Sequence, residues 1–482
     1  MKVALIFPTY AHKIFTENLS TVDEEFCVAP PIILAYVAAI LEKHGHAVML
    51  LDAKALTLSK EEALKRFVAF EPDILGFRAE TYYFHEALDW IRYLKAHLGV
   101  PVIAGGINLT LYPLEVLSHP EIDYGIIGEA FESLPRFLSA LENGDDYSRL
   151  SGVAYKDDEN KVVINPPEHK VYDFDLYPYP ARHLLPNDKY YSFVSQRKNF
   201  TIMLTSTGCP YGCLFCAIPF SYRVRTPENV VDEIEVCYQD FGVREIDFFD
   251  AVLFMPRERI REIFRLIQRR KLDIEWSARS RIDVVDEQLL KEAARAGCRQ
   301  IYYGIESADQ QILDSVKKGI QPKAVIETIK ISKKFGIRTM GFFMVGNPGE
   351  TKESVRKTIE FSKTLGLDFI QVSRTIPKPG TELDNAMMKV SMRDYWRMHV
   401  QGEEIAHRLP TPWVNLTEQE KESLAKEFYI KFYFRPRIIA QRILQLRSWE
   451  EFIRYIRVAL KIIFQKSELS LRRTGSEIKN YE

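Results

Sequence analysis

The sequence is poor in several features that would assign a protein to a class at once. Six cysteines in 482 residues are too few for a disulfide-stabilised secreted scaffold. The formal net charge is −1, so no excess of basic residues predicts binding to nucleic acid. No run of about 18 apolar residues is present, and residues 1–8 are typical of a strand rather than a signal peptide. These absences indicate a protein of a reducing cytoplasm, without a transmembrane helix.

Three of the six cysteines, in contrast, lie in one short loop. Cys209, Cys213 and Cys216 have the spacing C-x3-C-x2-C and directly follow a strand-like run at 200–204. Three thiolates can bind three irons of a cubane [4Fe-4S] cluster and leave the fourth iron open to a ligand, whereas a four-cysteine site is closed. The alternatives are an incomplete zinc site, although a zinc ribbon needs a second cysteine pair, or buried apolar thiols. The other three cysteines are isolated in apolar or helical contexts, so we expect them in the core.

The first 145 residues alternate between strand-like and helix-like segments. Strands are expected at 3–7, 48–51, 73–77, 102–104 and 124–127, with helices after Pro30, over 61–70 and 85–98, and from 129 to 141. This alternation predicts a doubly wound parallel sheet, in which ligands bind at the carboxyl ends of the strands. Gly105, Gly106 and Gly128 follow two of these strands, where glycine lets a ligand approach the backbone. Taken alone, these glycines also fit ordinary turns.

The rest of the chain divides into a connection, a barrel and a helical tail. A hairpin at 152–164 and the dense prolines of 166–180 indicate a connection over 146–195. Six strands follow within 196–383, at 201–204, 245–249, 274–278, 300–304, 339–345 and 369–373. They predict a partial (βα)6 TIM barrel with its chemistry at the carboxyl ends of the strands. Helices are expected over 387–407 and 418–465 within the tail, 384–482.

The cysteine loop and the barrel resemble radical S-adenosylmethionine (SAM) enzymes, specifically the members that have an N-terminal cobalamin-binding (B12-binding) domain over residues 1–145. The resemblance rests on the loop 208–216 and on the motifs Gly304-Ile305-Glu306-Ser307, Gly346-Asn347-Pro348-Gly349, Ala104-Gly105-Gly106 and Gly128-Glu129-Ala130. It implies a [4Fe-4S] cluster, SAM and cobalamin as cofactors. It further implies an enzyme that functionalises an unactivated carbon, by methylation or by oxidative or ring-forming chemistry. The D-x-H-x-x-G motif is absent, so no histidine of that loop is expected to bind cobalt.

The same resemblance implies roles for individual residues. Cys209, Cys213 and Cys216 would bind the cluster. Around SAM, Phe215 would lie against adenine, Asp250 would face the amino group, Arg279 (with Arg281 as second choice) would pair with the carboxylate, and Glu306 and Ser307 would lie near the ribose or methionine end. Gly105, Gly106, Gly128 and Glu129 would contact cobalamin. Asp250 stands where the family often has a Gly-Gly-Glu turn, which is a departure from the pattern. The rim residues of the barrel would equally fit a salt network at the strand ends.

The tail suggests a class of substrate and a place in the cell. Residues 421–466 contain eleven Lys and Arg, four Asp and Glu, and nine aromatic residues. Such helices can lie on an anionic membrane, cap the barrel or bind a substrate. Residues 429–437 resemble the branch with the anaerobic magnesium-protoporphyrin ester cyclase and hopanoid-associated enzymes, which implies a hydrophobic, small-molecule or lipid-like substrate. We expect a cytoplasmic enzyme, a low-potential electron donor such as a flavodoxin or ferredoxin, and 421–466 as the candidate for peripheral contact with the inner face of the membrane.

Two other functions stay open from the sequence. The first is a radical SAM enzyme that no longer binds cobalamin, which a bound corrinoid spectrum would exclude. The second is a non-catalytic iron–sulfur protein that relays electrons or only binds a partner. Formation of 5′-deoxyadenosine from SAM would exclude that second function.

Overall fold

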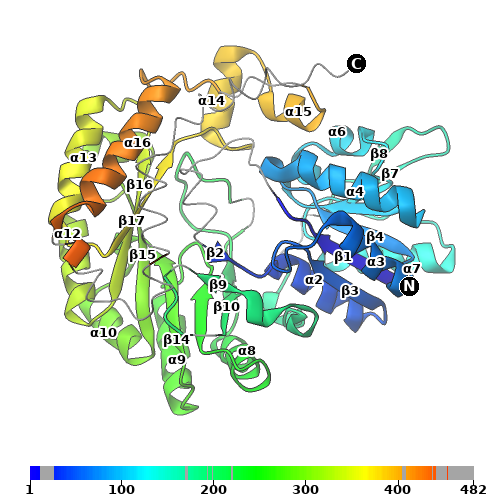
Figure 1. Ribbon diagram of the computed structural model, residues 1–482, viewed down its shortest axis with the longest axis horizontal. Helices are drawn as coiled ribbons and strands as arrows, with labels where there is room; N and C mark the ends of the chain where they lie inside the picture. Colours follow the sequence, from blue (N-terminus) through cyan, green and yellow to red (C-terminus); the bar gives the residue numbers. More distant parts are fainter. Residues whose placement is uncertain are drawn as a thin grey trace.

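The computed structural model describes residues 1–10, 27–168, 172–192, 194–197, 199–218, 221–403, 409–436, 438–440 and 453. Two lobes lie side by side, each built on a mainly parallel sheet (Figure 1). The N-terminal lobe contains a seven-stranded sheet and the barrel lobe a curved six-stranded sheet. The predicted fold class is confirmed, whereas the exact domain boundaries at 145/146, 195/196 and 383/384 stay predictions.

The N-terminal sheet has the strand order β3-β1-β4-β5-β6-β7-β8. Its strands are β1 Lys2–Phe7, β3 Ala47–Asp52, β4 Ile74–Arg78, β5 Val102–Gly105, β6 Tyr124–Ile126, β7 Val153–Lys156 and β8 Val162–Ile164. The first five pair in parallel and are rich in apolar residues because helices cover both faces of the sheet. These helices are α2 Ile32–Lys43, α3 Lys60–Phe70, α4 Phe84–Leu98, α5 Ile107–Leu111, α6 Pro113–Ser118 and α7 Ala130–Asn143.

The hairpin of β7 and β8 is present as predicted, but it belongs to the first sheet. β7 pairs antiparallel with β6, and β8 pairs antiparallel with β7. Val153 and Ala154 are fully buried at this edge. The sequence alone placed the hairpin in a connecting segment. Its pairing with β6 satisfies backbone groups that would otherwise stay open at the edge of the sheet.

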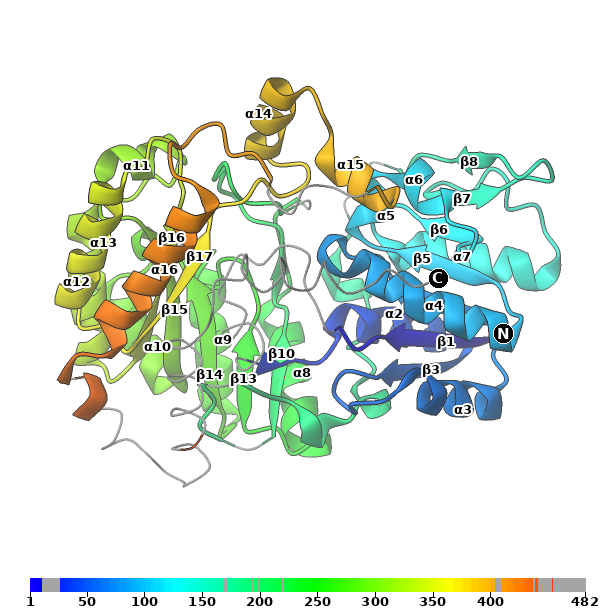
Figure 2. The same ribbon diagram turned by 45° about the horizontal axis from the view of Figure 1, so that its top comes forward.

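All six predicted barrel strands are confirmed, in the order β10-β13-β14-β15-β16-β17. They are β10 Phe200–Met203, β13 Glu245–Phe248, β14 Glu275–Ser280, β15 Cys298–Glu306, β16 Arg338–Val345 and β17 Phe369–Arg374. Helices α8 Pro227–Asp240, α9 Arg257–Arg269, α10 Glu287–Arg295, α11 Gln310–Ser315, α12 Pro322–Lys334 and α13 Lys352–Thr364 cover the outer face (Figure 2). Cys237 and Cys298 are buried in this core as predicted. Cys27 is only half-buried, on the short strand β2 (Cys27–Val28), which pairs with β9 (Tyr191–Ser192).

The tail begins with two helices where one was expected over 387–407. α14 (Glu382–Ser391) ends because Met392 takes a left-handed conformation, with φ +53°. α15 (Tyr395–Val400) then starts at Asp394, whose side chain accepts a hydrogen bond from Arg397 N. The expectation of a single helix was wrong, because helical periodicity continues across a break of a few residues.

The next helix, α16 (Glu418–Tyr433), packs on the barrel. Phe428, Tyr429 and Phe432 are buried in the barrel core, and Tyr429 Oη accepts a hydrogen bond from Val372 N at 2.9 Å. These aromatic residues therefore stabilise the barrel. Most of the stretch proposed for membrane contact, 421–466, lies outside the described residues. No helix in the described part of the chain has the length and apolar character needed to cross a bilayer.

α14 and α15 bridge the two lobes, as both views show (Figures 1 and 2). Trp396 is fully buried in the core of the N-terminal lobe, and its Nε1 donates to Pro377 O, at the barrel rim, at 2.8 Å. α15 is therefore joined both to the core of the N-terminal lobe and to the segment that follows β17.

Three histidines join α15 to the N-terminal lobe. His85 Nε2 lies 2.6 Å from His399 O, and His119 Nε2 lies 2.6 Å from Val400 O. His399 Nε2 in turn lies 3.1 Å from Thr81 O. Burial lowers the pKa of His399 to about 4, and the neighbouring His85 adds to that effect. Because burial disfavours the charged form of His399, its protonation in acid should weaken this junction.

His399→Gln should make the free energy of unfolding less dependent on pH in acid. Between about pH 6.5 and 4 the unfolded chain binds a proton at His399 that the folded chain rejects, so the free energy of unfolding falls as the pH falls. The full effect is about 3 kcal/mol for this shift. Denaturant titrations at several pH values would measure it. The exposed His97, changed to Gln, is the control and should keep the acid slope; an unchanged slope in His399→Gln would contradict the prediction.

Candidate active site at the facing strand ends

The cysteine loop is framed by a short antiparallel ladder. β11 (Ser206–Thr207) pairs with β12 (Arg223–Val224), and the described residues between them, 208–218 and 221–222, lie at the carboxyl end of the barrel. Leu214 N donates to Val316 O at 3.2 Å, which ties the loop to the segment after α11. The structure therefore places the cysteine loop at the carboxyl ends of the barrel strands, as predicted.

The three thiols form one electrostatic group. Cys209 and Cys213 are half-buried, Cys216 is exposed, and all are free. Burial raises the pKa of Cys213 and of Cys216; Cys209 adds to both, while Lys318 and Arg281 oppose the rise at Cys213. In the described part of the chain, no three His, Cys, Asp or Glu side chains converge as ligands of one ion.

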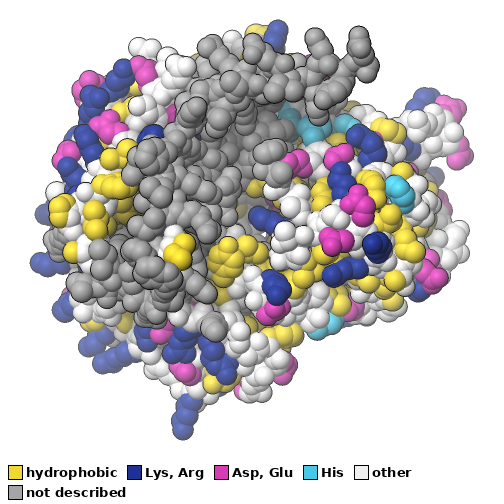
Figure 3. Space-filling view, in the orientation of Figure 1, with side chains coloured by type: hydrophobic (Ala, Val, Ile, Leu, Met, Phe, Trp, Pro, Cys, Tyr) yellow, Lys and Arg dark blue, Asp and Glu magenta, His cyan; other side chains and the backbone are white. Residues whose placement is uncertain are grey.

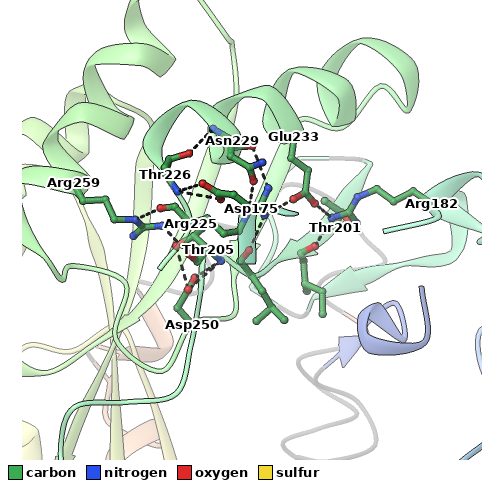
Figure 4. Close-up of polar contacts among 12 residues, drawn as sticks. Asp175, Arg182, Thr201, Thr205, Arg225, Thr226, Asn229, Glu233, Asp250 and Arg259 are labelled. Carbon is green, nitrogen blue, oxygen red and sulfur yellow. Dashed lines mark hydrogen bonds and ion pairs between the residues drawn. The ribbon is translucent and has the colours of Figure 1, made fainter. Parts of the chain in front are cut away.

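Asp250 holds the backbone that leads into the cysteine loop (Figure 4). Its carboxylate accepts hydrogen bonds from Thr205 N at 3.0 Å, from Thr205 Oγ1 at 3.1 Å and from Ser206 Oγ. Arg259 donates to Thr205 O at 2.7 Å from the other side. Burial raises the pKa of Asp250, and the bond from Ser206 opposes that rise. The role at the SAM amino group stays a prediction, and the observed contacts give Asp250 a positioning role.

A buried ionic triad lies beside this carboxylate (Figure 4). Glu233 on α8 is paired with Arg182, at 2.8 Å, and with Arg225. Arg225 also donates to Leu204 O at 2.9 Å, and Arg182 donates to Thr201 Oγ1 at 2.6 Å. Burial opposes the ionisation of Glu233, yet the two arginines lower its pKa overall. The triad therefore fixes both the connecting segment and the end of β10.

Arg279 lies on the inner face of the barrel with a carboxylate already beside it. Its NH1 donates to Asp247 Oδ1 at 2.8 Å. The guanidinium carbon lies 4.1 Å from the ring centre of Phe249 and 5.0 Å from that of Tyr302. Phe249 is 49% exposed, so an aromatic face is open next to the charge. Pairing of Arg279 with the SAM carboxylate stays a prediction.

Glu306 and Phe215 come together through a lysine that the motifs did not indicate. Lys318 Nζ lies 2.6 Å from Glu306 Oε1 and 6.0 Å from the ring centre of Phe215. Ser307, in contrast, is fully buried with its hydroxyl 3.2 Å from Thr358 Oγ1 on α13, so its observed contact is structural. Lys318 follows α11 without any recognisable motif, and only the fold brings it to the site.

The glycines predicted to contact cobalamin lie at the carboxyl edge of the N-terminal sheet. A side chain at Gly105 would project into open space, with no heavy atom within 4 Å of its Cβ. Gly106 has φ +110°, and a Cβ there would lie 3.0 Å from Ala79 O. Gly128 has φ +78°. The open backbone at Gly105 fits the close approach of a large cofactor.

Glu129, the fourth predicted contact, joins the two lobes. Its carboxylate pairs with both terminal nitrogens of Arg223 on β12, and both side chains are largely buried. A Cβ at Gly380, which follows β17, would lie 3.6 Å from Leu111 of α5. The carboxyl ends of the two sheets therefore face each other across the site.

The described histidines of the N-terminal lobe are all engaged elsewhere. Those on its helices and loops contact Ile40 O (His44), Glu142 (His46), His399 O (His85), Tyr93 O (His97) and Val400 O (His119). The expectation that no histidine of a D-x-H-x-x-G loop binds cobalt stays a prediction.

Comparisons with known proteins decide the family. The B12 binding domain model matches residues 27–138, and the Radical SAM superfamily model matches residues 203–362. An uncharacterized methyltransferase of Pyrococcus horikoshii is 32% identical over 453 residues, which cover 90% of this chain and 94% of that protein. The chain belongs to the B12-binding radical SAM enzymes. This confirms the predicted class, a radical SAM enzyme, and the predicted cofactors, which are a [4Fe-4S] cluster, SAM and cobalamin.

Two further matches agree with this family. The anaerobic magnesium-protoporphyrin IX monomethyl ester cyclase of Rubrivivax gelatinosus is 29% identical over 365 residues, covering 73% of this radical SAM enzyme and 65% of that protein. The structure of the radical SAM methyltransferase TsrM from Kitasatospora setae, with cobalamin and a [4Fe-4S] cluster bound, aligns with a TM-score of 0.64 at 20% identity. It covers 81% of this chain and 75% of TsrM. The latter match establishes a shared fold.

Proposed function

We propose that this radical SAM enzyme transfers a methyl group to an unactivated carbon of a hydrophobic small molecule. The observation that carries the proposal is the contact between the facing strand ends, where Glu129 of the N-terminal lobe pairs with Arg223 beside the cysteine loop. A cofactor on the N-terminal edge would therefore lie opposite one on the barrel rim. The relative that shares 94% of its length with this chain is named a methyltransferase, which supports methyl transfer.

The proposal assigns distinct tasks to the residues of the two edges. When bound, the cluster with SAM supplies a 5′-deoxyadenosyl radical, and cobalamin supplies a methyl carrier. Cys209, Cys213 and Cys216 would hold the cluster, and Phe215 would lie against adenine. Arg279, Glu306 and Asp250 would orient SAM directly or through the loop, with Ser307 near its ribose or methionine end. Gly105, Gly106, Gly128 and Glu129 would receive cobalamin. α14 and α15, which bridge the two lobes, would limit the access of water to the site.

The inner face of the barrel supports an apolar, ring-containing substrate. Tyr302 and Phe342 stack with ring centres 5.9 Å apart and an interplanar angle of 11°, but Tyr302 is buried, so this pair belongs to the wall of the barrel rather than to an open surface. Phe249 adds a half-exposed ring nearby, and Arg279 beside it is neutralised by Asp247. Flat apolar groups gain dispersion and hydrophobic energy against such surfaces. The relative named as a porphyrin ester cyclase supports ring-forming chemistry on such a substrate as a second candidate function.

The proposed partners are an electron donor and a membrane surface. A flavodoxin or ferredoxin would reduce the cluster. The basic residues of 421–466 would touch an anionic membrane, since the buried aromatic residues of α16 already belong to the barrel core. On the N-terminal lobe, acidic and basic side chains intermingle in the view of Figure 3. Purified protein should pellet with anionic vesicles at low salt, and no pelleting would count against the membrane contact.

Reconstituted protein should cleave SAM and hold a corrinoid. After anaerobic reduction we expect 5′-deoxyadenosine by chromatography, together with a bound corrinoid absorption spectrum. Cells supplied with methyl-labelled methionine should contain a labelled lipid that is missing from cells without the protein. Cleavage with no methyl label in the new product would favour ring formation, and a fully loaded cluster that yields no 5′-deoxyadenosine would overturn the proposal.

A further inference from the structure

One arginine at the barrel rim points at a cluster ligand while its own charge is already paired. Arg281 follows β14, and its NH1 lies 3.9 Å from Cys213 Sγ. Its Nε and NH2 donate to the two carboxylate oxygens of Asp283, at 2.9 and 2.8 Å. This fork leaves NH1 as the part of the guanidinium that faces the sulfur.

Two further contacts fix the direction of this side chain. NH2 also donates to Lys318 O at 2.7 Å, and the guanidinium carbon lies 3.8 Å from the ring centre of Tyr211 in the cysteine loop. Arg281 is 6% exposed. A planar donor group stacked on a ring and bound on two edges has little freedom left, so NH1 is preorganised toward Cys213.

The neighbouring cation has a different partner. Lys318 Nζ is paired with Glu306, and both side chains are buried. Its charge is thus compensated locally, whereas Arg281 directs a donor at a cluster sulfur. Hydrogen bonds to sulfur and nearby positive charge stabilise the additional electron of a reduced iron–sulfur cluster and raise its reduction potential.

We propose that Arg281 is a positioning residue that donates a hydrogen bond from NH1 to the thiolate of Cys213 and so raises the reduction potential of the cluster. The inference rests on the cluster ligands of the proposed function. This role differs from SAM binding, because Nε and NH2, the two donors with which Arg281 could bind a carboxylate side by side, already bind Asp283. A higher potential makes reduction by a weak donor easier, before SAM is cleaved.

The test is a redox titration of the reconstituted full-length protein without SAM, followed by electron paramagnetic resonance. At the midpoint potential of the unchanged protein, the ratio of reduced to oxidised cluster should fall about tenfold in Arg281→Gln, a shift of about 59 mV for one electron. Arg299→Gln is the control, because it removes an arginine from the amino-terminal end of β15, at the opposite end of the barrel. The control should keep the original midpoint.

Each outcome decides a separate point. An unchanged midpoint in a loaded Arg281→Gln variant would overturn the inference, also if its affinity for SAM fell, because Arg281 would then act on SAM. If that variant does not load the cluster, Arg281→Met decides, because methionine has neither the charge nor an N–H donor: a lower midpoint supports the inference and an unchanged one overturns it. If the unchanged protein itself binds no cluster, the proposed function fails first, and with it the basis of the inference.

Discussion

Cys213→Ala is expected to abolish both the cluster and the cleavage of SAM. A cubane held by three cysteines loses one of its three protein bonds, and Cys213 also carries the contact from Arg281. We expect iron content and charge-transfer absorption to fall to the level of cluster-free protein. The formation of 5′-deoxyadenosine should fall to background. Iron analysis and chromatography after anaerobic reconstitution measure the two effects.

The control for this substitution is Cys298→Ala. Cys298 is buried at the start of β15, at the end of the barrel opposite the cysteine loop. Its replacement leaves a small cavity but no missing ligand, so the cluster and the cleavage should persist. Retained cleavage in Cys213→Ala would remove Cys213 from the ligand set. Equal loss in both variants would indicate a general folding defect.

Glu233→Gln should destabilise the folded protein by about 3–5 kcal/mol, which is typical for the loss of one member of a buried ionic group. The substitution keeps the shape of the side chain and removes only its charge. Arg182 and Arg225 would then be two buried guanidinium groups without their shared carboxylate. Denaturant unfolding of the cluster-free protein under anaerobic conditions measures the change in the free energy of unfolding.

Glu235→Gln provides the matched comparison on the same helix. Glu235 pairs with Arg270 at 2.7 Å, but its side chain is 36% exposed, so water screens the ion pair. We expect a loss below about 1 kcal/mol. Similar losses in the two variants would mean that the buried triad contributes no more than a surface pair. The Glu233 variant should also load less cluster, because Arg225 binds the backbone of Leu204 before the cysteine loop.

The predicted strands were confirmed where the chain itself carries the pattern. β16 (Arg338–Val345) is an apolar run that both faces of the barrel bury, and such a run reads as a strand without knowledge of its neighbours. The hairpin of β7 and β8 was found for the same reason, but its membership of the first sheet was not. Pairing with β6 depends on a strand about 30 residues earlier, and nothing in the local pattern names that partner.

In the candidate site, too, the sequence predicted the local features and not the contacts between distant segments. The cysteine spacing indicates the cluster directly, because the three ligands lie within eight residues. Asp250 was predicted at the correct strand end, yet its contacts with Thr205 and Ser206 span about 45 residues. Lys318 and the triad around Glu233 were missed, since no motif marks a charged residue that folding buries beside its counterion.

The sequence by itself determined the alternation of strands and helices, the cysteine loop and the family, because these depend on neighbours within a few positions. Only the tertiary structure decided that Arg223 meets Glu129 between the lobes and that Arg281 faces Cys213. The physical reason is range along the chain: periodicity and ligand spacing are local, whereas a buried charge takes whichever partner the packed fold brings to it.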